Sequence, residues 1–409
     1  MLCRKPRSLC SLPPRAQHQY SRWVTVRVGV IGGGQLARMM IPAAVNLGLE
    51  LDVLAEIEGS SARLAATEVG DYRDAETVLR FAETVDVVTF DHEHVPEQIL
   101  RQLVAAGHSV QPGPDALRFA QDKLQMRRRL GELGVPMPDW AEVQNEDELA
   151  AFIADHGGEA VIKTARGGYD GKGVRLVRDA AEAADWFTAL SEDGRGGSLL
   201  AEERVDFRRE LAQLVARRPS GQTALWPVVE TVQRRGVCSE VFAPAPGTSA
   251  RVAELAASIA TLIATELGVT GVLAVELFET SDDRLLVNEL AMRPHNSGHW
   301  SIDGSVTSQF EQHLRAVLDL PLGDTGVRAP VTVMVNVLGG PATGTLADTY
   351  PHVFADQPSA KIHNYGKEPR PGRKIGHVTV TGDDLDTVVF QARAAAALLG
   401  ADLSDGSGS

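Results

Sequence analysis

The sequence predicts an α/β protein of three units, with a mixed α+β arrangement in the central unit. Near the N-terminus, strand-like and helix-like segments alternate around three consecutive glycines, a pattern typical of a parallel βαβ domain. Further along, short strands and helices follow one another without that regular alternation. An apolar strand at residues 331–337 then begins a third unit.

Length and composition support a multidomain protein. The chain has 409 residues, 44% of them hydrophobic, and a net charge of −14, which disfavours nonspecific binding to nucleic acid or an anionic membrane. No run of 18 apolar residues predicts a membrane span. The 3 cysteines show no paired spacing, so neither a disulfide framework nor a structural zinc site is expected. These features predict a soluble, cytoplasmic protein.

The two ends differ in composition from the rest of the chain. Residues 1–23 contain five basic residues and no Asp or Glu, while Pro13-Pro14 interrupts any transit-peptide helix. We therefore expect a disordered or spurious N-terminal extension, followed by domains over 24–114, 115–320 and 321–400. Residues 401–409 are expected to form a flexible tail.

In the first domain, strands are predicted at residues 26–31, 49–55 and 86–90, with a helix reaching residue 47. The pattern Gly32-x-Gly34-x-x-Ala37, with Glu56 at the end of the second strand, satisfies the dinucleotide-binding fingerprint. Such a turn also suits another phosphate ligand, or allows close strand–helix packing without any ligand. All three interpretations stay open on these residues alone.

The string Asp91-His92-Glu93-His94 follows the third strand. Two histidines without a third nearby ligand are weak evidence for a metal. We expect instead that the carboxylates of this loop hydrogen-bond a ribose.

A helix is predicted over residues 115–133, and a buried strand at 160–163 ends in Lys163. The loop 166–174 follows, with four glycines and three charged residues. A mobile backbone flanked by Lys163 and Lys172 suits nucleotide phosphates, although it is not a Walker A loop. The alternative is a surface hairpin.

A hairpin is predicted from strands at 272–280 and 284–290. A turn centred between Asp282 and Asp283 would place Glu276 opposite Glu289, with β-carbons about 5 Å apart. Two opposed carboxylates repel one another unless a cation lies between them, and Mg²⁺ bridging nucleotide phosphates is the natural choice. A register error of one residue would separate the acids onto opposite faces.

Two further segments are rich in groups that bind anions. Arg293-Pro-His-Asn-Ser-Gly-His299 follows the strand that carries Glu289, and Lys367-x-x-Arg370-Pro-Gly-Arg373-Lys374 places four cations in eight residues. In an acidic chain the second segment indicates a local anion site, with a solvated charge run as the alternative. A helix is also predicted over 249–267, with Leu255, Ile259, Leu262 and Ile263 on one face.

Together these motifs resemble the N5-carboxyaminoimidazole ribonucleotide synthases of the ATP-grasp superfamily. The resemblance covers residues 26–395 and rests on five strings: Gly34-Gln-Leu, Gln121-Asp-Lys, Gly167-Gly-Tyr-Asp-Gly, Asn288-Glu-Leu-Ala-x-Arg-Pro-His-Asn-Ser-Gly-His-Trp300 and Arg370-Pro-Gly-Arg-Lys-x-Gly-His377. The last two strings are highly specific. The resemblance implies an ATP-grasp fold with a Rossmann-like pre-ATP-grasp domain and a small C-terminal domain.

The resemblance also implies an activity: carboxylation of 5-aminoimidazole ribonucleotide by bicarbonate and ATP through carboxyphosphate, in a cytoplasmic homodimer. ATP would be bound by Lys123, Lys163, Gly168, Tyr169, Asp170, Gly171, Lys172, Gly173, Val174, Glu202, Glu203, Arg204, Val205, Glu210, Gln233, Asn288 and Glu289. Glu276 and Glu289 would hold Mg²⁺, with Mn²⁺ as a substitute. The catalytic residues would be Asp170, Arg293, His295 and Asn296. The ribonucleotide would contact Gln35, Leu36, Glu93, Tyr169, Lys367, Arg373 and Lys374.

The chain departs from the family pattern at several positions. Lys123 stands where the family often has arginine and Arg127 where it often has lysine, and Asp91-His-Glu-His94 replaces a usual Glu-x-Glu-Asn. Three rival functions follow from the same residues: another ATP-grasp ligase such as formate-dependent glycinamide ribonucleotide transformylase, an NAD(P)-dependent oxidoreductase, and a noncatalytic nucleotide sensor.

Overall fold

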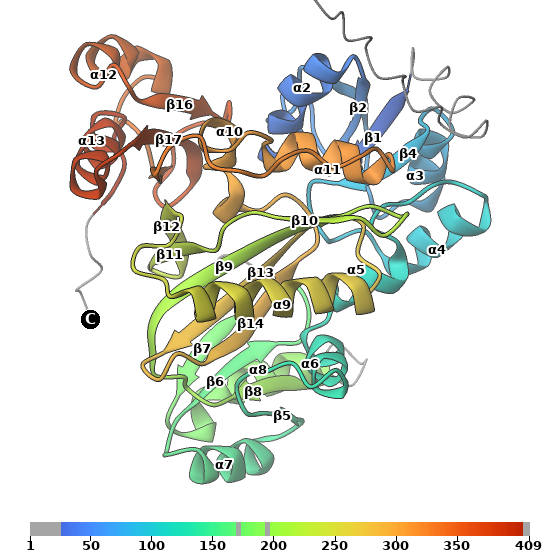
Figure 1. Cartoon of the computed structure of the whole chain (residues 1–409). Coiled ribbons are helices and arrows are strands. Elements are labelled where there is room, and N and C mark those ends of the chain that lie inside the picture. The colour runs from blue at the N-terminus through green and yellow to red at the C-terminus, as the bar shows by residue number, and fades with distance from the viewer. Residues whose placement is uncertain (1–25, 169–172, 193–196, 404–409) are drawn as a thin grey trace, which may run out of the picture.

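The protein contains three β-sheets surrounded by helices (Figure 1). The structure, a computed structural model, describes residues 26–168, 173–192 and 197–403. The expected extension at 1–23 and most of the expected tail therefore lie outside the described residues. Within the described ranges, no helix is both long and apolar enough to cross a bilayer.

The N-terminal unit is a parallel sheet in the order β3-β2-β1-β4, as the alternating pattern predicts. Its strands are β1 (Arg27–Ile31), β2 (Glu50–Ala55), β3 (Ala66–Val69) and β4 (Val87–Phe90), with helices α2 (Gln35–Leu47), α3 (Ala75–Ala82) and α4 (Glu97–Ala105). Helix α2 begins directly after the glycine turn and ends at Gly48, whose φ of 67° satisfies the left-handed cap. The glycine turn thus lies at the carboxyl end of β1, where parallel sheets place their sites.

The expected single helix over 115–133 is wrong, because it is two helices, α5 (Pro114–Gln121) and α6 (Lys123–Glu132). Asp122 separates them with extended backbone angles, and its side chain accepts a hydrogen bond from the Gln125 amide at 3.0 Å. An aspartate at this position stabilises a helix start more than it stabilises a helix interior. The Lys123 amide donates instead to the Ala165 carbonyl at 2.9 Å, which joins α6 to the glycine-rich loop.

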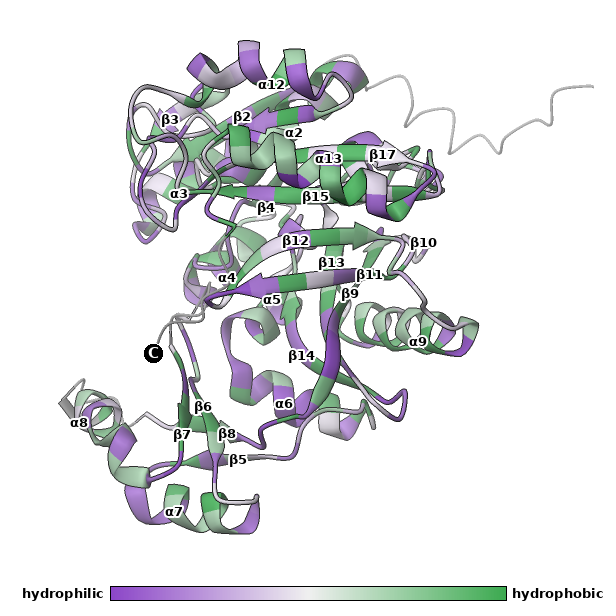
Figure 2. Ribbon diagram, turned by 90° about the vertical axis from the view of Figure 1, so that its left-hand side faces the viewer, coloured by the Kyte–Doolittle hydropathy of each residue, from purple (hydrophilic) through white to green (hydrophobic). Residues whose placement is uncertain are grey.

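A small antiparallel sheet in the order β5-β8-β6-β7 forms a separate lobe, at the bottom of Figure 1. Its elements are β5 (Trp140–Val143), α7 (Glu146–Asp155), β6 (Ala160–Thr164), β7 (Val174–Val177), η2 (Ala180–Ala183), α8 (Ala184–Glu192) and β8 (Leu199–Glu202). Strands β6 and β8 are mainly hydrophobic (Figure 2), and their apolar side chains pack against α7. The predicted strand 160–163 is thereby confirmed as β6.

The large sheet has the order β14-β13-β9-β11-β12-β15-β17-β16, and β10 pairs with β9. Its strands are β9 (Phe207–Arg217), β10 (Thr223–Leu225), β11 (Val229–Arg234), β12 (Val237–Ala243), β13 (Gly271–Thr280), β14 (Leu285–Ala291), β15 (Val331–Leu338), β16 (Lys361–Asn364) and β17 (Lys374–Gly382). Pairing of β12 with β15 carries the sheet across the expected boundary near residue 320. The central and C-terminal units therefore share one sheet.

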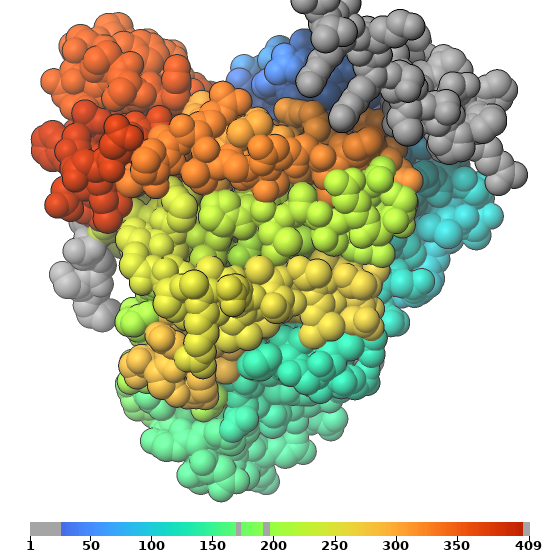
Figure 3. Space-filling view, viewed as in Figure 1, coloured from blue at the N-terminus to red at the C-terminus, as the bar shows by residue number. Residues whose placement is uncertain are grey.

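Helices pack against two parts of this sheet, one around β9 and β13 and the other around β15 and β17. They are α9 (Ala250–Glu266), η3 (Asn296–Gly298), α10 (Ser301–Gly304), α11 (Gln309–Val317), η4 (Leu346–Thr349), α12 (Tyr350–Asp356) and α13 (Leu385–Leu398). The predicted helix 249–267 is confirmed as α9, although Leu262 is exposed, because Val252, Ala256, Ile259 and Ile263 form the buried face. In the space-filling view the N-terminal and C-terminal units lie side by side at the top, with the small lobe at the opposite end (Figure 3).

Candidate active site

One cleft of about 1850 Å³ collects nearly all the predicted site residues. It is lined by Gln35, Leu36, Glu93, Lys123, Lys163, Gly168, Val174, Glu202, Glu203, Arg204, Val205, Glu210, Gln233, Glu276, Asn288, Glu289, Arg293, His295, Asn296, Lys367, Arg373 and Lys374. Gly173 lies just outside the lining, next to Val174. Tyr169, Asp170, Gly171 and Lys172 fall outside the described residues.

The two glutamates of the predicted hairpin face each other across neighbouring strands. Glu276 of β13 pairs with Glu289 of β14, as predicted. The predicted turn centre is wrong, however, because Glu279 pairs with Leu285 and the turn is therefore centred on Asp282. A β-bulge between Glu276 and Leu277 on one strand, opposite residues 287–289 on the other, restores the expected register. The acids meet because of this extra residue in β14.

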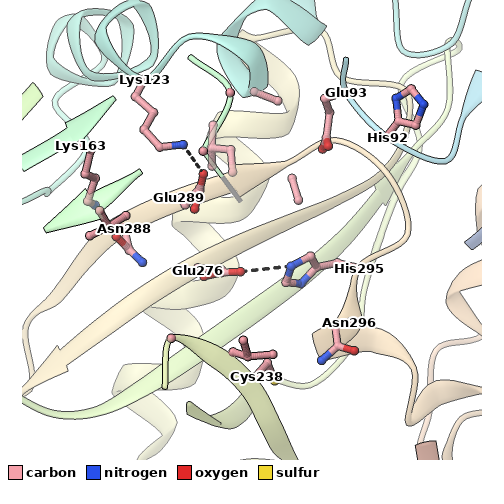
Figure 4. Close-up of a pocket in the computed structure, with 18 of the residues that line it drawn as sticks. His92, Glu93, Lys123, Lys163, Cys238, Glu276, Asn288, Glu289, His295 and Asn296 are labelled. Atoms are coloured by element: carbon pink, nitrogen blue, oxygen red, sulfur yellow. Dashed lines mark hydrogen bonds and ion pairs between the residues drawn. The ribbon is translucent and has the colours of Figure 1, made fainter. Parts of the chain in front are cut away.

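The bulge also determines where the side chain of Asn288 points. In a regular strand, successive side chains lie on opposite faces, but both Asn288 and Glu289 line the cleft. Lys163 Nζ donates to Asn288 Oδ1 at 3.0 Å, and Lys123 Nζ donates to Glu289 Oε1 at 2.6 Å (Figure 4). Two lysines from the opposite wall of the cleft therefore meet two oxygen-bearing groups on β14.

His295 is the partner of Glu276. Its Nε2 lies 3.1 Å from Glu276 Oε1, while its Nδ1 accepts from the Ser297 amide at 3.3 Å, so the ring proton is on Nε2 (Figure 4). Burial alone would raise the pKa of Glu276, but the hydrogen bond from His295 and nearby cations bring it below the ordinary value. Glu276 is thus held as a carboxylate facing the cleft.

Glu202 lies buried at the end of β8 between two cations. Lys163 Nζ is 2.6 Å from one of its oxygens, and Arg127 Nε is 2.6 Å from the other. Burial would raise the pKa of Glu202, but the charges of Arg127 and Lys163 hold it below its ordinary value. Both carboxylate oxygens of Glu202 are engaged. The accessible groups at this wall therefore belong to the residues that follow β8, Glu203 to Val205.

Glu93 is bound to Arg293 from the opposite side of the cleft. Arg293 Nε donates to Glu93 Oε2 at 2.6 Å, and the Met292 amide donates to Oε1 at 3.0 Å. The Gln121 side chain holds the same loop through the carbonyls of Glu93 and Val95. Glu93 therefore orients Arg293 within the cleft.

The remainder of the Asp91–His94 string organises the glycine turn. Asp91 Oδ1 accepts from the Ala37 amide at 2.7 Å, and a Cβ on Gly34 would lie only 1.9 Å from Asp91 Oδ2. His92 Nε2 lies 3.1 Å from one oxygen of Glu56, whose other oxygen accepts from the Gly33 amide at 3.0 Å. A carboxylate thus occupies the start of α2, where a dinucleotide would need its pyrophosphate, and this disfavours the dinucleotide alternative. Among the described residues, no three His, Cys, Asp or Glu side chains form a metal cluster.

The basic segment forms the other end of the cleft. Lys367 Nζ donates to Gln35 Oε1 at 2.7 Å, which joins this segment to the start of α2. Arg370, Arg373 and Lys374 line the cleft next to it. Four cations at one end of an otherwise acidic chain favour binding of an anionic group over the solvated-charge alternative.

Comparisons with known proteins match all three units. Residues 25–121 match the ribonucleotide synthetase preATP-grasp domain, residues 128–310 the ATP-grasp domain, and residues 332–390 the phosphoribosylaminoimidazole carboxylase C-terminal domain. The N5-carboxyaminoimidazole ribonucleotide synthase of Mycobacterium bovis is 52% identical over 373 residues, which cover 90% of this chain and 86% of that one. The chain belongs to the N5-carboxyaminoimidazole ribonucleotide synthase family.

Solved structures of this family have the same fold. The carboxyaminoimidazole ribonucleotide synthase of Aspergillus clavatus complexed with ATP superposes with a TM-score of 0.83 at 32% identity, covering 92% of this chain and 99% of that one. The same Aspergillus clavatus enzyme in complex with ADP and 5-aminoimidazole ribonucleotide gives 0.82 at 31% identity, with the same coverage. The predicted ATP-grasp fold, with its pre-ATP-grasp and C-terminal domains, is confirmed.

The oxygen donors of the cleft fit a divalent cation. Glu276 and Glu289 oppose each other on one face, and the amide oxygen of Asn288 lies beside them. Carboxylate and amide oxygens suit Mg²⁺, which completes its coordination with phosphate oxygens and water. In this structure Lys123 offsets negative charge at Glu289, and the ring N–H of His295 donates to Glu276.

Several residues of this cleft have no signal in the sequence. Cys238 lies in its wall, where burial raises the thiol pKa to about 12 and makes a nucleophilic role implausible on chemical grounds. Phe207 and Phe278 stack at 4.7 Å between ring centroids and form an apolar wall. The strand pattern predicts apolar residues there, but not which of them face the cleft. Only the pairing of β9 with β13 brings these two rings together.

Proposed function

We propose that this chain carboxylates 5-aminoimidazole ribonucleotide with bicarbonate and ATP in purine biosynthesis, giving N5-carboxyaminoimidazole ribonucleotide, ADP and phosphate. The observation that carries the proposal is a single cleft with a lysine-and-carboxylate end, a basic end beside Gln35, and Arg293, His295 and Asn296 between them. The Aspergillus clavatus relative, solved with ADP and the ribonucleotide together, supports this use of the two ends.

ATP would occupy the end of the cleft between the small antiparallel sheet and the large sheet. Lys123 and Lys163 would contact its phosphates, and the segment from Glu202 to Val205 would contact the adenine through its backbone. Glu210 and Gln233 would accept and donate hydrogen bonds at the ribose. Gly168, Gly173 and Val174 flank the proposed phosphate loop, whose remaining members, Tyr169 to Lys172, fall outside the described residues.

Glu276, Glu289 and Asn288 would hold Mg²⁺, or Mn²⁺ in its place. Bound there, the cation would neutralise charge on the phosphates of ATP during phosphoryl transfer. Glu276 lies 3.1 Å from His295 Nε2 and Glu289 lies 2.6 Å from Lys123 Nζ, so both carboxylates face the place where the cation would bind.

The reaction would then proceed in two steps. A bicarbonate oxygen attacks the γ-phosphorus while the bond to ADP breaks, giving carboxyphosphate. The exocyclic amine of the ribonucleotide next forms a bond to the carboxyl carbon, the carbon–oxygen bond to phosphate breaks, and the amine proton leaves with the phosphate. Arg293 would hold bicarbonate and offset charge on the transferred group, with His295 and Asn296 completing its contacts. Tyr169 and Asp170 are proposed to stack on the imidazole and orient its amine.

The ribonucleotide would lie at the basic end. Lys367, Arg373 and Lys374 would bind its phosphate, with Gln35 and Leu36 of α2 beside the ribose. Glu93 would act on this substrate by orienting Arg293. We further infer a cytoplasmic homodimer, because the family resemblance implies both.

The test is ADP release by the purified protein with ATP, Mg²⁺ and bicarbonate, with or without aminoimidazole ribonucleotide. We expect strong stimulation by the ribonucleotide, loss of turnover in Glu289→Gln, and parental activity in Glu254→Gln, which changes an exposed acid on α9. If glycinamide ribonucleotide with formate supports turnover instead, the proposed substrate is wrong. If neither supports turnover while ATP still binds, the chain is a noncatalytic nucleotide sensor.

A further inference from the structure

Arg127 is the one fully buried member of an arginine triplet on α6. Its neighbours Arg128 and Arg129 are partly exposed and pair with Glu142 and Glu132 near the surface. The Arg127 side chain, by contrast, has 0% exposure and does not line the cleft. A guanidinium so far from solvent has to satisfy its donors within the protein.

All three nitrogens of this guanidinium are engaged. Nε donates to Glu202 Oε1 at 2.6 Å, Nη1 to the Val287 carbonyl at 2.9 Å, and Nη2 to the Asn288 carbonyl at 2.7 Å. Two of these three acceptors are main-chain groups of β14, 160 and 161 residues away in sequence. An arginine that served only to neutralise Glu202 would not need to bind these two carbonyls.

The two carbonyls belong to the bulge of β14. This strand is at the edge of the large sheet, so its outer main-chain groups have no neighbouring strand. Arg127 binds the outer carbonyls that a neighbouring strand would otherwise bind. Pro136 does the same for the Val287 amide, which donates to the Pro136 carbonyl at 2.9 Å. The irregular stretch that turns both Asn288 and Glu289 into the cleft is therefore held from behind by the Arg127 side chain.

The same helix reaches the site directly. Lys123 and Arg127 are four residues apart and lie on one face of α6, and Lys123 binds the Glu289 carboxylate that Arg127 positions through the backbone. On its other side Arg127 fixes Glu202, which in turn binds Lys163. One guanidinium thus connects the acids on β14 with the lysine of β6.

We propose that Arg127 is a positioning residue for the metal and phosphate groups of this site. It sets the β14 bulge so that Asn288 and Glu289 face the cleft together, and it fixes the Glu202 carboxylate beside Lys163. The inference rests on the proposed use of Glu276, Glu289 and Asn288 to hold a divalent cation. Removal of a group that orients a metal ligand typically weakens metal binding by about 10–100-fold.

The test compares Arg127→Lys with Arg128→Lys and Arg129→Lys on the same helix. The lysine variant keeps a positive charge for Glu202, but its N–H donors share one nitrogen, so they cannot reach Glu202 and both bulge carbonyls together as the three separate guanidinium nitrogens do. Mn²⁺ binding to the protein with ADP is measured by electron paramagnetic resonance, alongside ADP affinity without metal. We expect Arg127→Lys to bind Mn²⁺ about 10–100-fold more weakly with unchanged metal-free ADP affinity, and the two controls to match the parent.

A second variant covers the case in which Arg127→Lys does not fold. The double variant Arg127→Met with Glu202→Gln removes the buried Arg127–Glu202 pair as a unit, and Lys163, which loses Glu202, keeps its hydrogen bond to Asn288 Oδ1. Weak Mn²⁺ binding in this folded protein supports positioning, whereas parental Mn²⁺ binding shows that Arg127 only neutralises Glu202 and overturns the proposal. Because this assay needs no turnover, a parent that binds Mn²⁺ but does not carboxylate would refute the proposed function alone. A parent that binds no Mn²⁺ with ADP would overturn the positioning role.

Discussion

Glu210 is an acid whose environment raises its pKa to about 7. Burial in the cleft is the main cause, the negative charge of Glu276 adds to it, and a hydrogen bond from Gln233 opposes it. Glu210 therefore carries a proton over part of the pH range in which an ordinary glutamate is ionised. A cation at Glu276 would cancel one of the charges that keep this proton bound.

We predict that binding of ADP with Mg²⁺ releases a proton from Glu210. The cation lowers the pKa of Glu210, so the protein loses up to one proton at about pH 6 and none at about pH 9, where Glu210 is already ionised. Titration calorimetry in buffers of different ionisation enthalpy measures this proton count. Glu210→Gln should abolish the release, and Glu254→Gln should retain it. Equal release by Glu210→Gln and the parent would assign the proton to another group.

At the scale of single residues, the sequence predicts groups whose signal lies within one element. Lys163 is recognisable as a charge ending an apolar strand, and Glu276 and Glu289 as acids on facing strands. It does not predict that Glu93 binds Arg293, because 200 residues separate them. Nor does the local pattern show which arginine of the triplet is buried, since only the packing of α6 against β14 buries Arg127.

At the scale of elements, the two errors have one physical origin. Helical periodicity continues through residues 115–133, but Asp122 ends one helix and caps the next. Strand alternation likewise continues through β14, but a bulge adds one residue. In both places a hydrogen bond to a residue far away in sequence overrides the periodic pattern. The Lys123 amide binds the Ala165 carbonyl at the helix break, and Arg127 binds the Asn288 carbonyl at the bulge.

The break at Asp122 joins α6 to the start of the glycine-rich loop. Its carboxylate accepts from the Gln125 amide and, at 3.0 Å, from Arg166 Nε. We predict that Asp122→Ala lowers the free energy of unfolding by about 1 kcal/mol through loss of the helix cap. Asp122→Asn keeps the cap and should have nearly parental stability. Both changes remove the ion pair with Arg166, so both should raise the KM for ATP several-fold.

Chemical denaturation and ATP saturation curves separate these two effects. A KM that rises only in Asp122→Ala would show that the cap, and not the Arg166 contact, positions the loop. Arg128→Lys, which alters a more exposed charge on the same helix, serves as the control for both measurements.

At the scale of the whole molecule, the basic end of the cleft lies where the N-terminal and C-terminal units meet. Arg38 of α2 donates through Nε to the Asn364 carbonyl and through Nη1 to the Ser61 carbonyl, each at 2.9 Å. Lys367 and Gln35 form a second link at the same junction. The composition shift and the loop signals predict separate units, but no local pattern predicts the Arg38–Asn364 and Lys367–Gln35 contacts, because their partners are more than 300 residues apart.

The junction should therefore control ribonucleotide binding without affecting the nucleotide end. We predict that Arg38→Ala raises the KM for aminoimidazole ribonucleotide several-fold, because it frees the Asn364 carbonyl and loosens the segment that carries Lys367. The Kd for ADP should stay at the parental value, since Lys123 and Lys163 lie on other elements. Arg80→Ala, which removes a surface ion pair with Glu68 in the same N-terminal unit, should leave both constants unchanged. Parallel losses of ADP and ribonucleotide binding in Arg38→Ala would instead mean that this contact stabilises the whole fold and has no particular role at the basic end.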